Sequence, residues 1–206
     1  MTTSNNPFLI RQSEATTIEN PTSKEWLFRV AEGGILSADF LQTDADLSVR
    51  VLLEGIGAKC FLRCGYLLNK NNKINIDVQV VHKSRETVSE QQIRGIVTDM
   101  SQVSFTGTIR IPYDSQKCDG RQQHRGIVLS DQARVSATPQ LEIWADDVKC
   151  AHGSAIGPLD QNQLFYLQTR GISEPDAKKL LLSSFFGDLM PVAFEPFIQN
   201  WMAENV

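Results

Sequence analysis

Alternating hydrophobic and polar residues along the first three quarters of the chain predict β-strands. In residues 73–80 isoleucine and valine occupy every second position, and residues 103–111 repeat the arrangement. A period of two is typical of a half-buried strand. Similar short runs recur at roughly ten-residue spacing, which is typical of all-β proteins. The further candidate strands are residues 26–31, 35–40, 48–53, 59–67, 93–98, 127–129, 134–137 and 141–145.

These strands predict an all-β core but leave its winding open. No hexapeptide-like repeat is visible, so a sandwich and a β-helix both fit the pattern. Changes in composition and the positions of proline and glycine divide the chain into three expected parts. These are a loose, polar N-terminal arm over residues 1–24, a β core over 25–157, and a helical C-terminal domain over 158–206.

The C-terminal part has helix signals in place of alternation. Asp160 is expected to cap a first helix that Gly171 ends, and Ser173 to cap a second that ends at Gly187. A third helix is predicted over residues 192–204. These helices are rich in large apolar residues, which can pack onto the β core, form a docking surface for a partner, or do both. The candidate partner-binding residues are Leu180, Phe185, Phe186, Phe194, Phe197 and Trp201.

Composition narrows the classes of function. With 206 residues, 41% of them hydrophobic, the chain suits one domain with a packed core. A net charge of −4 gives no basic surface for nucleic acid. No apolar run approaches the roughly 20 residues that span a bilayer, and the N-terminus does not resemble a signal peptide. We therefore expect a cytoplasmic protein without nucleic-acid or membrane partners.

Common catalytic motifs are missing from the sequence. It has no GxSxG, HExxH, GxxxxGK[ST] or GxGxxG pattern, so neither a hydrolase of these types nor ATP binding by this chain is expected. Trp144 beside Asp146 leaves open a β-helix enzyme or module that acts on carbohydrate, because such proteins line a groove with acids and aromatics. No second carboxylate is marked as a partner for Asp146.

Cys150 and His152 are the strongest candidate for metal chemistry. The cysteines, at 60, 64, 118 and 150, lack zinc-site spacing and read as free thiols. If the segment around Cys150 and His152 is extended, both side chains point to one face, about 7 Å apart. A thiolate and an imidazole suit a soft metal or an iron–sulfur species, with the other ligands supplied elsewhere. The alternative is a buried free cysteine and a hydrogen-bonded histidine.

Residues 139–153, 157–160 and 164–172 together resemble the SufB/SufD family, and its SufD branch in particular. They include the sequence Lys149-Cys150-Ala151-His152-Gly153 and the junction with the first helix. A looser similarity extends over residues 75–190. The resemblance implies a right-handed parallel β-helix followed by a small helical domain.

The resemblance also implies a function. Family members are non-catalytic scaffolds of SUF iron–sulfur cluster assembly. SufB and SufD pair through their β-helices, and each docks the ATPase SufC through its C-terminal helices. By this resemblance His152, with Cys150 beside it, contributes to a transient cluster site shared with SufB. A homodimer remains open, as does a purely structural SufC-docking paralogue.

The chain differs from the family pattern at three points. Only a short polar arm precedes the first strand, where SufD members carry a long helical region. Ala151 stands where serine is usual, and His124 where asparagine is common. The Ala151 side chain should face away from Cys150 and His152, so we expect this difference to matter little.

Overall fold

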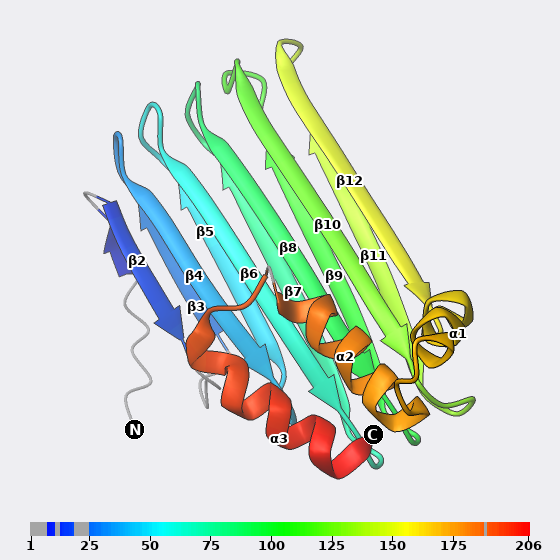
Figure 1. Cartoon of the computed structure of the whole chain (residues 1–206). Coiled ribbons are helices and arrows are strands. Elements are labelled where there is room, and N and C mark those ends of the chain that lie inside the picture. The colour runs from blue at the N-terminus through cyan, green and yellow to red at the C-terminus, as the bar shows by residue number, and fades with distance from the viewer. Residues whose placement is uncertain (1–7, 11–12, 19–24, 188) are drawn as a thin grey trace.

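Two parallel six-stranded sheets, facing each other, form the body of the protein (Figure 1). The computed structural model describes residues 8–10, 13–18, 25–187 and 189–206. One sheet has the order β1 (Phe8–Ile10), β3 (Glu25–Val30), β5 (Leu47–Leu53), β7 (Lys73–His82), β9 (Gln102–Ile111) and β11 (Arg134–Ile143). The other has the order β12 (Val148–Gly157), β10 (Cys118–Val128), β8 (Val88–Val97), β6 (Lys59–Leu68), β4 (Ile35–Gln42) and β2 (Ser13–Ile18).

Consecutive strands lie in opposite sheets, so the chain winds as a parallel β-helix. Val88 pairs with Lys59 one coil earlier and lies beside Asp119 one coil later, offsets of 29 and 31 residues. Near the start the offset is smaller, 22 residues between Ser13 and Ile35. This variation explains why no repeat is visible in the sequence. The predicted all-β core with a helical C-terminus is confirmed, and the winding is that of a β-helix.

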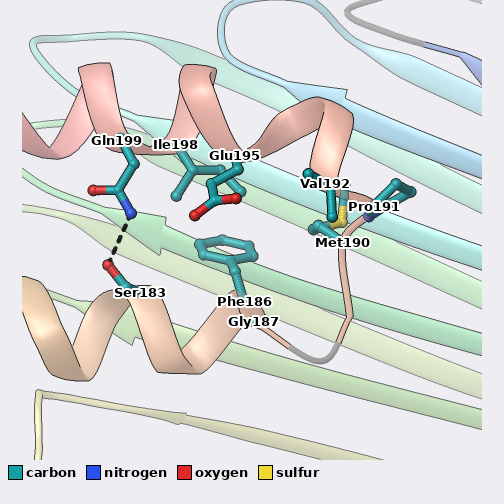
Figure 2. Close-up of a pocket in the computed structure, with 9 residues that line it drawn as sticks. All are labelled: Ser183, Phe186, Gly187, Met190, Pro191, Val192, Glu195, Ile198 and Gln199. Carbon is teal, nitrogen blue, oxygen red and sulfur yellow. Dashed lines mark hydrogen bonds between the residues drawn. The ribbon is translucent and has the colours of Figure 1, made fainter.

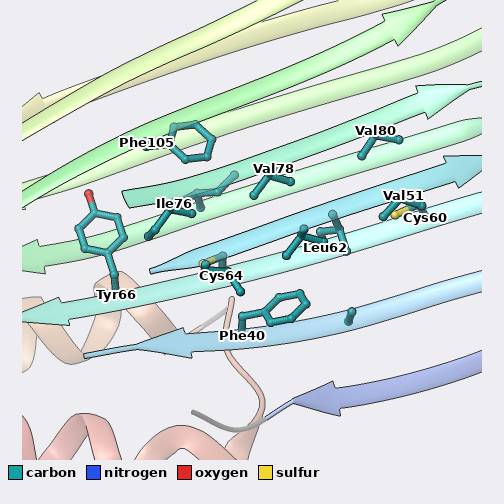
Figure 3. Close-up of a cluster of buried hydrophobic side chains, with 14 of the residues drawn as sticks. Phe40, Val51, Cys60, Leu62, Cys64, Tyr66, Ile76, Val78, Val80 and Phe105 are labelled. Carbon is teal, nitrogen blue, oxygen red and sulfur yellow. The ribbon is translucent and has the colours of Figure 1, made fainter. Parts of the chain in front are cut away.

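The core fills the space between the two sheets (Figure 3). Cys60, Leu62 and Cys64 of β6 point inward at alternate positions and are buried. Opposite them lie valine and isoleucine side chains of β5 and β7, which pack in the same cluster. Burial of this apolar surface, at roughly 25 cal/mol per Å², is the main stabilising contribution to the body.

Three α-helices follow the last strand: α1 (Gln161–Thr169), α2 (Glu174–Gly187) and α3 (Glu195–Asn205), the last preceded by a short 3-10 helix, Val192–Phe194. The carboxylate of Asp160 accepts hydrogen bonds from the backbone N–H groups of the first turn of α1. Gly171 has a φ of +86°, a left-handed conformation that suits glycine, just beyond the end of α1. The predicted caps at Asp160 and Gly171 are confirmed.

Helices α2 and α3 cover the outer face of the sheet that contains the even-numbered strands β2 to β12, which we call the even-numbered sheet. They lie near the carboxyl ends of its strands (Figure 1). Leu41, Leu67 and Ile96 point outward from β4, β6 and β8 and belong to one buried cluster with the helices. Their helical partners are Leu182, Phe186, Phe194, Ile198, Trp201 and Met202. The second half of β6 is therefore buried on both faces, whereas its first half is buried on one.

The expected N-terminal arm is described only in part. Phe8–Ile10 and Ser13–Ile18, within residues 1–24, are strands of the β-helix and not the loose segment we expected. The remaining positions of the arm, 1–7, 11–12 and 19–24, lie outside the described residues. Among the helices that the structure describes, none is long and apolar enough to cross a membrane.

Candidate functional site

The candidate site lies on β12, the last strand of the β-helix. Within the described residues β12 pairs with β10 alone, so its other edge is open. Cys150 lies beside Gly120 and His152 beside Gln122, in register. Gln122 points into the core, and paired residues of parallel strands point to the same side. Cys150 and His152 therefore share the inner face, as strand geometry predicts.

The surroundings of Cys150 and His152 differ. His152 is exposed, because no further strand covers it among the described residues. Cys150 is half-buried, and this burial raises the pKa of its thiol, with a smaller opposing effect from a hydrogen bond to the backbone of Gly120. In the isolated chain Cys150 is thus a protonated thiol at neutral pH, and it would lose its proton on binding a metal.

A buried hydrogen-bonded group lies next to Cys150. The ring nitrogens of His82 are 2.8 Å from Oγ1 of Thr87 and 2.9 Å from Oγ of Ser89. Thr87 is in turn 3.1 Å from Sγ of Cys118. Desolvation lowers the pKa of His82 to about 4, with a smaller opposing effect from Asp119. His82 is therefore neutral at pH 7 and acts as a hydrogen-bonding residue of the core.

His124 forms a second buried group, further along the same face. Its ring stacks on Phe105 at a centroid distance of 5.0 Å, and its Nε2 lies 3.0 Å from the hydroxyl of Tyr66. Its Nδ1 lies 3.1 Å from Oγ of Ser154 on β12. Desolvation lowers the pKa of His124 to about 4. His124, which stands where the family pattern commonly has asparagine, thus links the core to the open strand β12.

The last coils contain a polar lane that strand prediction missed. Ser89 and Gln91 of β8, with Gln122 and His124 of β10, are buried inward-facing residues. Earlier coils have apolar residues in the corresponding places, such as Leu62, which is in register with Gln91. The signal in the sequence was the lack of hydrophobic alternation before and after residues 103–111, on the two sides of a clearly alternating strand.

The two candidate ligands of β12 are an incomplete set. Among the residues that the structure describes, no group of three or more histidine, cysteine, aspartate or glutamate side chains could hold a metal ion. The open edge of β12 nevertheless leaves His152 accessible from outside the chain. Such an arrangement can contribute one ligand to a site that a second chain completes.

The six candidate partner-binding residues divide into buried and exposed ones. Phe186, Phe194 and Trp201 are 2%, 0% and 9% exposed and form the contact between the helices and the sheet. Phe185 is partly buried against the same cluster. Leu180 and Phe197 are 50% and 48% exposed. Of the six candidate residues, only Leu180 and Phe197 offer a large apolar surface to a partner.

A pocket of about 150 Å³ lies between α2 and α3 (Figure 2). Phe186, Met190 and Ile198 supply apolar walls, and Glu195 lies at the same opening. The side chain of Gln199 on α3 donates to Ser183 on α2 at 3.3 Å across one end. Val192, 81% exposed, borders the pocket. The volume of the pocket suits one apolar side chain of a partner.

The fold and the site define a parallel β-helix with an open last strand that carries the candidate residues Cys150 and His152, and an appended set of apolar helices. A family model described as "SUF system FeS cluster assembly, SufBD core domain" matches residues 33–185. The chain therefore belongs to the SufB/SufD family. This family membership confirms the resemblance that residues 139–172 carry.

Individual relatives agree with this family. The chain is 32% identical to the iron-sulfur cluster assembly protein SufD of Escherichia coli over 177 residues, which cover 83% of this chain and 42% of that protein. It is 39% identical to an iron-sulfur cluster assembly SufBD family protein of Synechocystis over 95 residues, 46% of this chain and 21% of the relative. A SufD of Bacillus subtilis is 32% identical over 121 residues, 59% and 27% of the two chains. The chain thus spans less than half the length of these relatives.

Proposed function

We propose that this protein is a non-catalytic scaffold subunit of the SUF iron–sulfur cluster assembly machinery. It contributes His152, with Cys150 beside it, to a cluster site shared with SufB, and docks the ATPase SufC through its C-terminal helices. The observation that carries the proposal is the position of His152: exposed, facing the interior side, on a strand with an open edge. The cluster is cargo here, and ATP is bound by SufC.

The open edge of β12 supports pairing with another β-helix. This strand has ten residues and no proline, so its backbone groups are available to a partner strand. β11, the neighbouring edge, has Pro139 near its middle, which lacks an N–H to donate. β12 is therefore the better edge for addition of a strand from SufB, or from a second copy of the chain. The cytoplasmic location remains a prediction.

Leu180 and Phe197 support SufC docking, together with the pocket between α2 and α3. Exposed large apolar residues are typical of protein interfaces, and the pocket adds a second apolar feature on the same two helices. The buried Phe186, Phe194 and Trp201 would support this surface from below.

Co-expression with SufB and SufC tests both parts of the proposal. We expect the three proteins to co-purify, and the variants Leu180→Asp and Phe197→Asp to lose SufC while keeping SufB. Tyr113→Asp is a matched control, since Tyr113 is 67% exposed and belongs to the loop that follows β9. The arrowhead of β9 lies at the end of the strands opposite helices α2 and α3 (Figure 1). Retention of SufC by both helix variants would reject the docking surface.

The ligand role is tested on the purified complex. His152→Ala should lower the amount of cluster formed under anaerobic reconstitution, as read from visible absorption. Lys149→Ala, on the outer face of the same strand, should have no effect. If wild type and His152→Ala form equal amounts of cluster, the ligand role of His152 is rejected. The alternative of a purely structural subunit that docks SufC would then stand.

A further inference from the structure

A row of three polar side chains crosses the even-numbered sheet at its inner face. Gln91 on β8, Gln122 on β10 and His152 on β12 are in register with one another. The two glutamines are buried, and Nε2 of Gln122 donates to Oε1 of Gln91 at 2.7 Å. In the part of the chain that the structure describes, Oε1 of Gln122 is buried and has no hydrogen-bond partner. Leaving a buried oxygen of this kind without a hydrogen-bond partner is unfavourable.

The direction of this oxygen follows from the planar geometry of an amide. Because Nε2 of Gln122 is turned toward β8, Oε1 lies on the opposite side of the amide, toward β12. The residue in register on β12 is His152. Adjacent strands are about 4.8 Å apart, so an imidazole N–H is within reach of that oxygen. His152 is exposed, and its ring can turn without a change in the backbone.

The opposite sheet holds the Gln122 amide in place. Gly107 on β9 faces it, and a Cβ at this position would lie 2.4 Å from Nε2 of Gln122. Only glycine leaves room for the amide to lie against the backbone of β9. Gln122 is thus fixed at two sides, by Gln91 and by Gly107, while His152 is free to turn.

We propose that Gln122 is the positioning residue of His152: Oε1 accepts a hydrogen bond from one ring nitrogen and leaves the other nitrogen, unprotonated, directed at the open end. This rests on the proposed ligand role of His152. A histidine that binds iron through one nitrogen needs a fixed tautomer, and a hydrogen bond to the other nitrogen fixes it. The neighbouring Gln91 acts one step further back, by holding the amide.

Three variants of this chain, each purified in complex with SufB and SufC, test the inference. Gln122→Leu keeps the approximate volume and removes the acceptor. Gln91→Leu removes the hydrogen bond to Nε2 of Gln122 but keeps the acceptor oxygen of Gln122. Gln122→Glu restores an acceptor at the original position. The measurements are the rate at which a chelator removes iron from the reconstituted complex, and the urea midpoint of the isolated chain.

Loss of such an outer partner costs about 10–100-fold in metal affinity. We expect Gln122→Leu to release iron 10–100-fold faster, Gln91→Leu within about threefold of wild type, and Gln122→Glu close to wild type. Gln122→Leu and Gln91→Leu both break the hydrogen bond between the two buried amides, so their urea midpoints should fall by similar amounts. A purely structural role would therefore speed iron release to the same extent in the two variants.

Two outcomes separate the inference from the function on which it rests. If His152→Ala leaves iron release unchanged, the ligand role fails, and the positioning role fails with it. If His152→Ala speeds release but Gln122→Leu behaves as Gln91→Leu does, the ligand role stands and the inference is overturned.

Discussion

The two buried histidines make the stability of this protein sensitive to mild acid. His82 and His124 are both fully buried, and their pKa values are lowered from 6.5 to about 4, in each case chiefly by desolvation. In the unfolded chain each imidazole takes up a proton near pH 6.5, whereas in the folded chain it does so only near pH 4. Between these values the unfolded state binds more protons, so the free energy of unfolding falls as the pH falls.

The magnitude follows from the two pKa values. Above pH 6.5 the contribution is fully present, and at pH 5 about 2 kcal/mol per histidine has been lost. We therefore expect the free energy of unfolding to decrease by roughly 4 kcal/mol between pH 7.5 and pH 5, a large part of the 5–15 kcal/mol typical of a domain. Carboxylates with ordinary pKa values near 4 contribute little in this range.

Urea unfolding followed by circular dichroism, at several pH values with a reductant present, measures this decrease. In the double variant His82→Gln with His124→Gln the decrease should shrink to below about 1 kcal/mol, whatever its stability at pH 7.5. Imidazole NMR signals of the wild type give a second measurement, and those of the two buried rings should stay constant between pH 7 and 5.5. A wild-type stability that is flat over this range, or signals of the two buried rings that titrate near 6.5, would refute the reasoning.

Three further predictions concern packing and accessibility. Gly95→Ala should lower the free energy of unfolding in urea by about 3 kcal/mol, because its methyl group would lie 2.0 Å from a buried tyrosine ring. In the control Gly153→Ala no neighbouring side chain or strand lies within 4 Å of the added methyl group, so the urea midpoint should match wild type or rise slightly. Phe186→Ala should cost about 3–5 kcal/mol by leaving a cavity under the helices, and Phe165→Ala, at a position 67% exposed, less than about 0.5 kcal/mol by the same assay. A thiol reagent at pH 8 should label only Cys150 in the native chain, since the other three cysteines are buried, and four thiols in urea; rapid labelling of a second native thiol would contradict this burial.

Sequence pattern located the strands of the early coils well, because their inward positions are apolar. The predicted strand 73–80 corresponds to β7, and 59–67 to β6. It failed at β8 and β10, where only residues 93–98 and 127–129 were predicted. These two strands carry Ser89, Gln91, Gln122 and His124 inward, so no hydrophobic alternation exists there to detect. The strands that were hardest to predict are those that border the site.

The same physical cause limited prediction of the site. Spacing placed Cys150 and His152 on one face correctly, since strand geometry alone decides it. Spacing could not show that His152 lies at an open edge, because that depends on which strands pair. Nor could apolar residues on the helices be divided into buried and exposed ones: Phe186 and Phe197 differ only in which side of their helix meets the sheet.

The coil that carries His152 is also an end unit of a one-dimensional array. In a solenoid each unit is held mainly by its nearest neighbours, so an end unit has half of the usual support and frays before the middle. β12 contacts β10 on one side, and among the described strands it has no neighbour on the other. A strand added there by a partner would therefore act as the missing neighbour, and would slow amide hydrogen exchange along β12. In that case association of the partner and local folding of β12 are one coupled equilibrium, and the affinity of the partner includes the free energy of ordering this strand.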